Sequence, residues 1–209
     1  MIRHFDKASI LEAESFFRRD LINSLSGYKS LNLIGTKNKI GTTNLSPFSQ
    51  VFHIGATPPT VGVLFRPHTV ERHTLENILE TGFFTLNHVT EEFYKEAHQT
   101  AARYEESEFE AVGLKEVYFD NFFAPFVASS PVKVACSLLE SITLQVNETV
   151  LVVGSIEHVY VEDKGLNADG SLDLEKLGTV TCSGLDTYYL GKKLARLSYP
   201  KPGKPLQEI

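Results

Sequence analysis

The chain has 209 residues, of which 42% are hydrophobic and 22% are charged, and it carries a formal net charge of −6 at pH 7. This composition is typical of a globular protein with one full core, and the acidic balance argues against a nucleic-acid partner. No apolar run approaches the ~18 residues of a membrane-spanning helix, and the N-terminus lacks the apolar core of a signal peptide. We therefore expect a cytoplasmic protein without membrane contact, in which Cys136 and Cys182 are buried free thiols.

The N-terminal segment, residues 1–27, is expected to be helical. Ser9 and Glu12 have the spacing of a capping box, apolar residues follow at helical intervals, and Gly27 would end the helix. Short strands are expected next, at residues 31–36, 41–44, 50–54 and 60–65. Because proline donates no backbone hydrogen bond, the Pro58-Pro59 step predicts a loop or a sheet edge before the last of them.

The middle of the chain is expected to contain helices around one strand. Residues 74–81 form a short amphipathic pattern that Gly82 would end, and the alternating aromatic and β-branched residues 83–88 predict a strand. A longer helix is expected at residues 90–104 and a shorter one at residues 107–112.

The second half of the chain is expected to be mainly β. Its predicted strands are residues 132–139, 142–146, 150–153, 156–161, 180–182 and 186–190. A brief helix is expected at 172–177, and the proline-rich tail, 199–209, is either disordered or a strap across a partner subunit. Short strands separated by turn signals favour a small antiparallel barrel. No linker divides the chain, so a single domain is expected over residues 1–209.

A polar segment at the end of the second predicted strand is a candidate ligand-binding element. Its residues are Thr42, Thr43, Asn44, Leu45, Ser46 and Ser49. Hydroxyl groups and backbone amides at a strand end can hold the ribityl chain or the ring edge of a flavin. The same residues also suit a strand followed by a turn, so both interpretations stay open at this point.

A candidate anion site follows this segment along the chain. Arg66 ends an apolar strand, and its guanidinium group could contact a phosphate in bidentate fashion, although a single Arg is by default a surface residue. Thr74 lies at the start of the next helix, where it could cap the helix or bind an anion at the free amides. His73 could donate to the same anion.

Other kinds of site find little support in the sequence. The remaining histidines are scattered without the spacing of metal ligands, so no metal site is expected. Glycine-rich phosphate loops and a serine nucleophile motif are absent. A run of acidic residues is interpreted as a solvated face; it consists of Glu105, Glu106, Glu108 and Glu110.

The order of these segments resembles the flavin reductase-like family, the FMN-binding split barrels. In that family an N-L-A-P-F-S-like strand is followed by a Pro-Pro strand, an Arg, a K-D-T-x-x-N-I helix start and a G-x-F-x-x-N strand. Here the pieces read NLSPFS from Asn44, PPTV from Pro58, then Arg66, RHTLENI from Arg72 and GFFTLN from Gly82. Later segments also fit, namely SEF at 107–109, GSI at 154–156 and GLDTYY at 184–189.

The resemblance implies a fold and a cofactor. The fold would be mainly β with helices (α+β), an antiparallel Greek-key split barrel with N-terminal and inserted helices. Residues 43–46, with Thr42 and Ser49 beside them, would contact the ring and ribityl chain of FMN, and the phosphate would be held by Arg66, His73 and Thr74. The sequence departs from the family at His73, where an acid is usual.

The resemblance also implies an activity and an assembly. Bound FMN would take electrons from NADH or NADPH and pass them to an acceptor, without a catalytic acid or base from the protein. The alternative is an FMN-binding electron carrier or cofactor-binding protein that is not a reductase. The family forms homodimers with FMN near the subunit interface. Tyr188 or Tyr189 could pack near the flavin, or serve only core or dimer packing.

Overall fold

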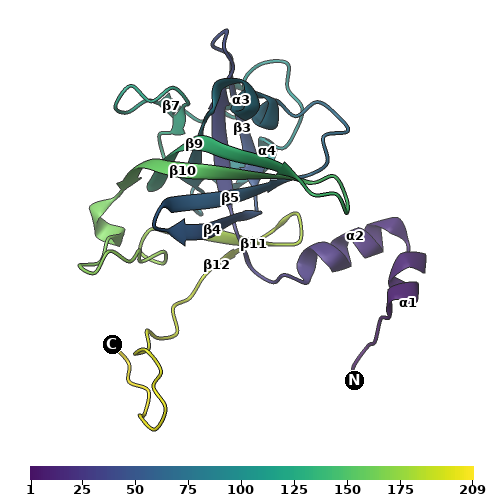
Figure 1. Cartoon of the computed structure of the whole chain (residues 1–209), viewed down its shortest axis with the longest axis vertical. Helices are drawn as coiled ribbons and strands as arrows, with labels where there is room; N and C mark the ends of the chain where they lie inside the picture. Colours follow the sequence, from purple (N-terminus) through teal and green to yellow (C-terminus); the bar gives the residue numbers. More distant parts are fainter.

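The computed structural model describes all 209 residues and is built around one curved antiparallel sheet (Figure 1). Its seven strands lie in the order β3-β2-β6-β9-β10-β5-β4. Their bounds are β2 Asn32–Lys37, β3 Thr43–Phe48, β4 Val51–Ala56, β5 Pro59–Phe65, β6 Phe83–His88, β9 Val132–Thr143 and β10 Val150–Val161.

The sheet is rolled into a barrel that does not close. Strands β3 and β4 lie at opposite ends of the strand order, yet only Ser49 and Gln50 separate them along the chain. The two edges of the sheet therefore come together at this corner, although β3 and β4 do not pair with one another. The mainly β, α+β class and the antiparallel split barrel expected from the sequence are confirmed.

Smaller elements surround the barrel. A three-stranded sheet joins β1 (Lys29–Ser30), β11 (Val180–Ser183) and β12 (Thr187–Leu190), and β7 (Glu116–Val117) pairs with β8 (Phe126–Val127). The inserted helices are α3 (His73–Thr81), α4 (Tyr94–Gln99) and α5 (Glu108–Val112), and η1 (Asp163–Gly165) is a single 3-10 turn. None of the helices is long and apolar enough to cross a membrane.

The N-terminal segment is helical, as predicted, but it forms two helices that extend away from the barrel (Figure 1). These are α1 (Lys7–Glu12) and α2 (Ser15–Ser24), and neither buries a residue. The predicted capping box at Ser9 is wrong, because Asp6 caps α1 and accepts a 2.8 Å hydrogen bond from the Ser9 amide. The Glu14 carboxylate caps α2 by accepting from two amides, and this cap divides the segment.

Three regions contain elements that differ from the predicted ones. The four strands expected between residues 132 and 161 are two long strands, β9 and β10, whose bulges at Val153/Gly154 and Ile156/His158 let the ladder continue past the turn-like residues. The helix expected at 90–104 is only α4, because the Thr100 hydroxyl bonds the Ala97 carbonyl and the chain turns there. Residues 172–177 form turns rather than a helix.

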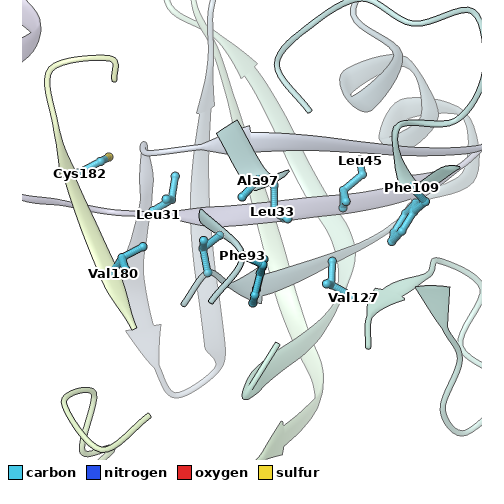
Figure 2. Close-up of a cluster of buried hydrophobic side chains, with 10 residues drawn as sticks. Leu31, Leu33, Leu45, Phe93, Ala97, Phe109, Val127, Val180 and Cys182 are labelled. Carbon is cyan, nitrogen blue, oxygen red and sulfur yellow. The ribbon is translucent and has the colours of Figure 1, made fainter. Parts of the chain in front are cut away.

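Both faces of the central strands are buried, which gives the molecule two main cores. Successive residues Leu33 and Ile34 on β2 enter different clusters, as the period of a strand requires. Figure 2 shows the first cluster, in which Leu45 of β3 faces Phe109 of α5. The second cluster includes Ile78 of α3 and strands β5, β6, β9 and β10. Both cysteines are buried free thiols, as expected.

Candidate functional site

A cleft of about 670 Å³ lies where the β3–β4 corner, the start of α3, the loop after α4 and β12 meet. It is large enough for a cofactor of the size of a mononucleotide. Seven of the ten predicted site residues line it, namely Asn44, Ser46, Ser49, Arg66, His73, Thr74 and Tyr188. Thr42 and Thr43 line a neighbouring cleft instead, and the Leu45 side chain lies in the core.

Strand alternation explains which residues of β3 reach the cleft. Because Leu45 points into the core, Asn44 and Ser46 on either side of it point to the opposite face. The Asn44 amide donates a 2.9 Å hydrogen bond to the Thr74 hydroxyl, and both side chains are buried. This bond joins the polar wall of the cleft to the first turn of α3.

The N-terminus of α3 is an uncapped helix end that faces the cleft. No side chain caps this nine-residue helix, whereas Asp6 and Glu14 cap the two N-terminal helices. Arg66 lies beside it, exposed and with no hydrogen bond or ion pair in this structure. Free amides, the positive end of the helix dipole and an unpaired guanidinium group together form a site for an anion.

His73 occupies the first position of α3 with its ring exposed. Its Nε2 lies 3.5 Å from a carboxylate oxygen of Glu71, so the imidazole has an acidic neighbour on the preceding loop. Glu76 completes a group of three potential metal ligands within 4.8 Å. The Glu76 carboxylate is already engaged, since His68 bonds it at 2.8 Å and the Arg72 amide donates to it at 2.9 Å.

Of the two tyrosines considered, Tyr188 lines the cleft. Its hydroxyl lies 2.6 Å from Nδ1 of His98, and its ring packs 5.5 Å from that of Tyr94. Burial raises the pKa of Tyr188 to about 12, so the phenol keeps its proton at neutral pH and can donate to the imidazole. Tyr189 instead packs against Tyr28, with ring centroids 4.9 Å apart.

Glu108 is the main residue that the sequence interpretation misassigned. It is buried, with 9% of its surface exposed, and its carboxylate accepts a 2.9 Å hydrogen bond from the Leu45 backbone amide. The adjacent Ser107 hydroxyl bonds that of Thr43 at 2.8 Å. The predicted solvated face is therefore wrong for Glu108, although the other three carboxylates of the run are exposed. A contact that spans 63 positions leaves no local signal in the sequence.

Other cleft residues were also missed. Arg72 and Arg103 add two guanidinium groups to the lining, and the buried Cys182 adds a thiol whose pKa is raised by burial. The Arg72 side chain is oriented by a 3.0 Å bond from its Nε to the Pro67 carbonyl. Arg72 had a usable signal, since it directly precedes the predicted helix, whereas Arg103 lies in the loop that was predicted to be helical.

Comparison with known proteins gives a consistent result over most of the chain. Residues 29–175 match the flavin reductase like domain. A solved candidate flavin reductase with a split barrel domain, from Shewanella frigidimarina NCIMB 400, is 50% identical with a TM-score of 0.92, over 95% of this chain and 100% of that chain. Flavoredoxin of Desulfovibrio vulgaris (Miyazaki F) is 25% identical with a TM-score of 0.71, over 81% of this chain and 91% of that one.

A curated relative is similar to this chain over a comparable length. An uncharacterised protein of Halalkalibacterium halodurans is 30% identical over 183 residues, which are 82% of this chain and 87% of the relative. The similarity thus extends across the barrel and the cleft.

Proposed function

The chain belongs to the flavin reductase-like domain family, and from that premise we propose that it is an FMN-binding flavoprotein that acts as an NADH- or NADPH-dependent flavin reductase. A flavin-related redox function follows from the family itself. The choice of FMN, the nicotinamide donor and the residues that hold the cofactor are the proposal.

One observation carries this proposal: the uncapped N-terminus of α3 beside the unpaired Arg66, at the mouth of the 670 Å³ cleft. The phosphate of FMN would accept hydrogen bonds from the first-turn amides and from Arg66, with His73 and Thr74 next to it. Thr74 would be held for this role by Asn44. A helix N-terminus favours a bound monophosphate, and Arg66 beside it would add charge-assisted hydrogen bonds.

The rest of the cofactor would lie along β3 and the β3–β4 corner. Asn44 and Ser46 offer polar groups on the cleft face, and Ser49 lies at the corner. Tyr188 adds an aromatic side chain to the lining. Thr42, Thr43 and Leu45 would act at most indirectly, since Thr43 bonds Ser107 and the Leu45 amide is taken by Glu108.

Bound FMN supplies the electron chemistry, taking electrons from a nicotinamide donor and passing them to an acceptor. The protein's part is to bind, orient and partly enclose the cofactor, and no acid or base from the chain is required. We propose that residues 1–209 act as one domain, as a homodimer with FMN near the subunit interface, in the cytoplasm.

An FMN titration of the purified protein tests the proposal. Arg66→Ala should weaken FMN binding about 10- to 100-fold, because a charge-assisted hydrogen bond is worth roughly 1.5–3 kcal/mol. The matched control is Arg3→Ala, which removes an exposed arginine from the N-terminal segment and should leave the affinity unchanged. A wild-type protein that takes up no FMN, followed by absorbance and by quenching of flavin fluorescence, would refute the proposal.

The second candidate is an FMN-binding electron carrier, favoured by the similarity to a flavoredoxin. The same cleft would serve both functions. Stopped-flow mixing distinguishes them: rapid bleaching of the bound flavin by NADH or NADPH supports a reductase, whereas bleaching only by a reduced protein donor supports a carrier.

A further inference from the structure

The C-terminal tail, residues 191–209, ends in a hairpin over residues 196–209. Leu197 and Glu208 form an antiparallel bridge. The Ser198 amide donates to the Gln207 carbonyl at 2.8 Å, and the Ile209 amide donates to the Arg196 carbonyl at 2.9 Å. The sequence left open either disorder or a strap across a partner subunit.

This tail buries none of its own apolar side chains. Its exposed large residues are Leu194 (95%), Leu197 (53%), Tyr199 (84%), Leu206 (57%) and Ile209 (69%). An isolated two-stranded hairpin is at best marginally stable in water. An ordered hairpin with a row of uncovered apolar residues therefore calls for a surface that covers it.

The hairpin is attached to its own barrel only near its base. The Arg196 guanidinium group pairs with the Asp169 carboxylate, and the Lys193 amide donates to Glu175 at 3.2 Å. Beyond these contacts the tail runs clear of the barrel, as the yellow segment in Figure 1 shows. Each leg of about six residues spans roughly 20 Å, which is enough to lie along part of one face of a neighbouring molecule.

The charge of the tail is opposite to that of the rest of the chain. Residues 191–209 contain five Lys or Arg residues and one acidic residue, a net charge of +4. The whole chain has 20 basic and 26 acidic residues, which leaves 15 and 25 for residues 1–190, a net charge of −10. The remainder of a second copy of this chain therefore carries a net charge complementary to that of the tail.

We propose that the C-terminal hairpin of one copy packs across a second copy of the chain and holds the dimer together. The inference rests on the homodimer of the proposed function and names the segment that stabilises it. The N-terminal helices offer the apolar part of the contact, because Phe16 and Ile22 on α2 and Leu25 directly after it are exposed at 63%, 46% and 69%. Both terminal segments extend beyond the barrel on its lower side in Figure 1.

An anionic membrane is a less suitable binding partner for the same tail than a second copy of the chain. The proline-rich hairpin presents no amphipathic helix of the kind that inserts into lipid headgroups. The −10 charge on the remainder of the chain would be repelled by anionic lipid, whereas it attracts the tail of another copy.

Sedimentation of the FMN-loaded protein over a concentration series tests the proposal. Deletion of residues 191–209 should raise the dimer dissociation constant about tenfold or more, without loss of folding, because the deleted segment buries no apolar side chain. The double variant Lys201→Glu/Lys204→Glu should also weaken the dimer at about 0.05 M salt, with a smaller effect at about 0.5 M. Lys95→Glu/Lys115→Glu makes the same charge change at exposed positions of the barrel and should have a smaller effect.

The outcomes separate this inference from the proposed function. A dimer that keeps its wild-type dissociation constant after deletion of the tail overturns the proposed role of the hairpin while leaving the homodimer intact. A wild-type protein that is monomeric overturns both. Binding of the wild type to phosphatidylserine vesicles that is lost in Lys201→Glu/Lys204→Glu, with the dimer unaffected, would assign the tail to lipid and overturn the inference.

Discussion

Substitution of Glu108 tests whether the inserted helix α5 holds the cleft wall in place. The carboxylate lies 2.9 Å from the Leu45 amide, and both residues are buried. Glu108→Ala leaves that amide without a partner, which should lower the free energy of unfolding by about 2–3 kcal/mol, since hydrogen bonds to charged groups are worth roughly 1.5–3 kcal/mol. Glu108→Gln keeps an acceptor oxygen and should cost only about 1 kcal/mol.

Urea denaturation of the FMN-free protein measures these losses, and a flavin titration measures the consequence for the cleft. Because β3 carries Asn44 and Ser46, loosening it in Glu108→Ala should also weaken FMN binding. The matched control is Glu110→Ala, an exposed carboxylate in the same helical turn, which should change stability by no more than about 0.5 kcal/mol. If Glu108→Ala and Glu110→Ala are equally stable, the buried hydrogen bond does not stabilise β3 and the reasoning is wrong.

Three further predictions follow from other parts of the structure. Gly35→Ala should destabilise the fold by more than about 2 kcal/mol in thermal melts. The added Cβ would clash with the Pro125 carbonyl and stand 2.7 Å from the Thr85 hydroxyl. Gly191→Ala is the control and should be neutral, because the space around Gly191 is open. Burial lowers the pKa of His88 from 6.5 to about 4, so the unfolded state binds more protons than the folded state between these pH values. The free energy of unfolding should therefore rise with pH across this window by up to about 3 kcal/mol. His88→Gln should remove that part of the pH dependence. Tyr188→Phe removes the hydroxyl that lies 2.6 Å from Nδ1 of His98, and nitrogen NMR should then show a changed Nδ1 chemical shift; an unchanged shift would contradict the assigned bond.

The sequence predicted elements whose signals are local. Helix α3 and strand β6 were placed to within a residue, because Gly82 adopts the left-handed conformation that ends the helix and residues 83–88 alternate as a strand does. The helix at 90–104 was overextended, since its apolar spacing continues beyond α4. The chain instead leaves the helix at Thr100, and Thr90 forms a bridge with Thr179 that no local pattern reveals.

The candidate site divides in the same way. Arg66, His73 and Thr74 line the cleft. They could be chosen as candidates because they stand at a strand end and a helix start, positions that the sequence marks directly. The bonds that complete the cleft, Asn44 to Thr74 and Leu45 to Glu108, join residues 30 and 63 positions apart. Such pairings depend on the path of the barrel, so the sequence alone could not show that a carboxylate of the acidic run is buried.

Strand β3 makes stability and ligand binding depend on one another. It is the last strand at one end of the sheet, so its outer backbone groups would be free to pair with another chain. Glu108 and Ser107 bond this strand from α5, while Phe109 of the same helix packs in the cluster that holds the Leu45 side chain. One short helix thus bonds a backbone amide at this edge and fills the core. The cleft face of β3 is left to polar side chains, so a change in α5 acts both on the stability of β3 and on the polar wall of the cleft.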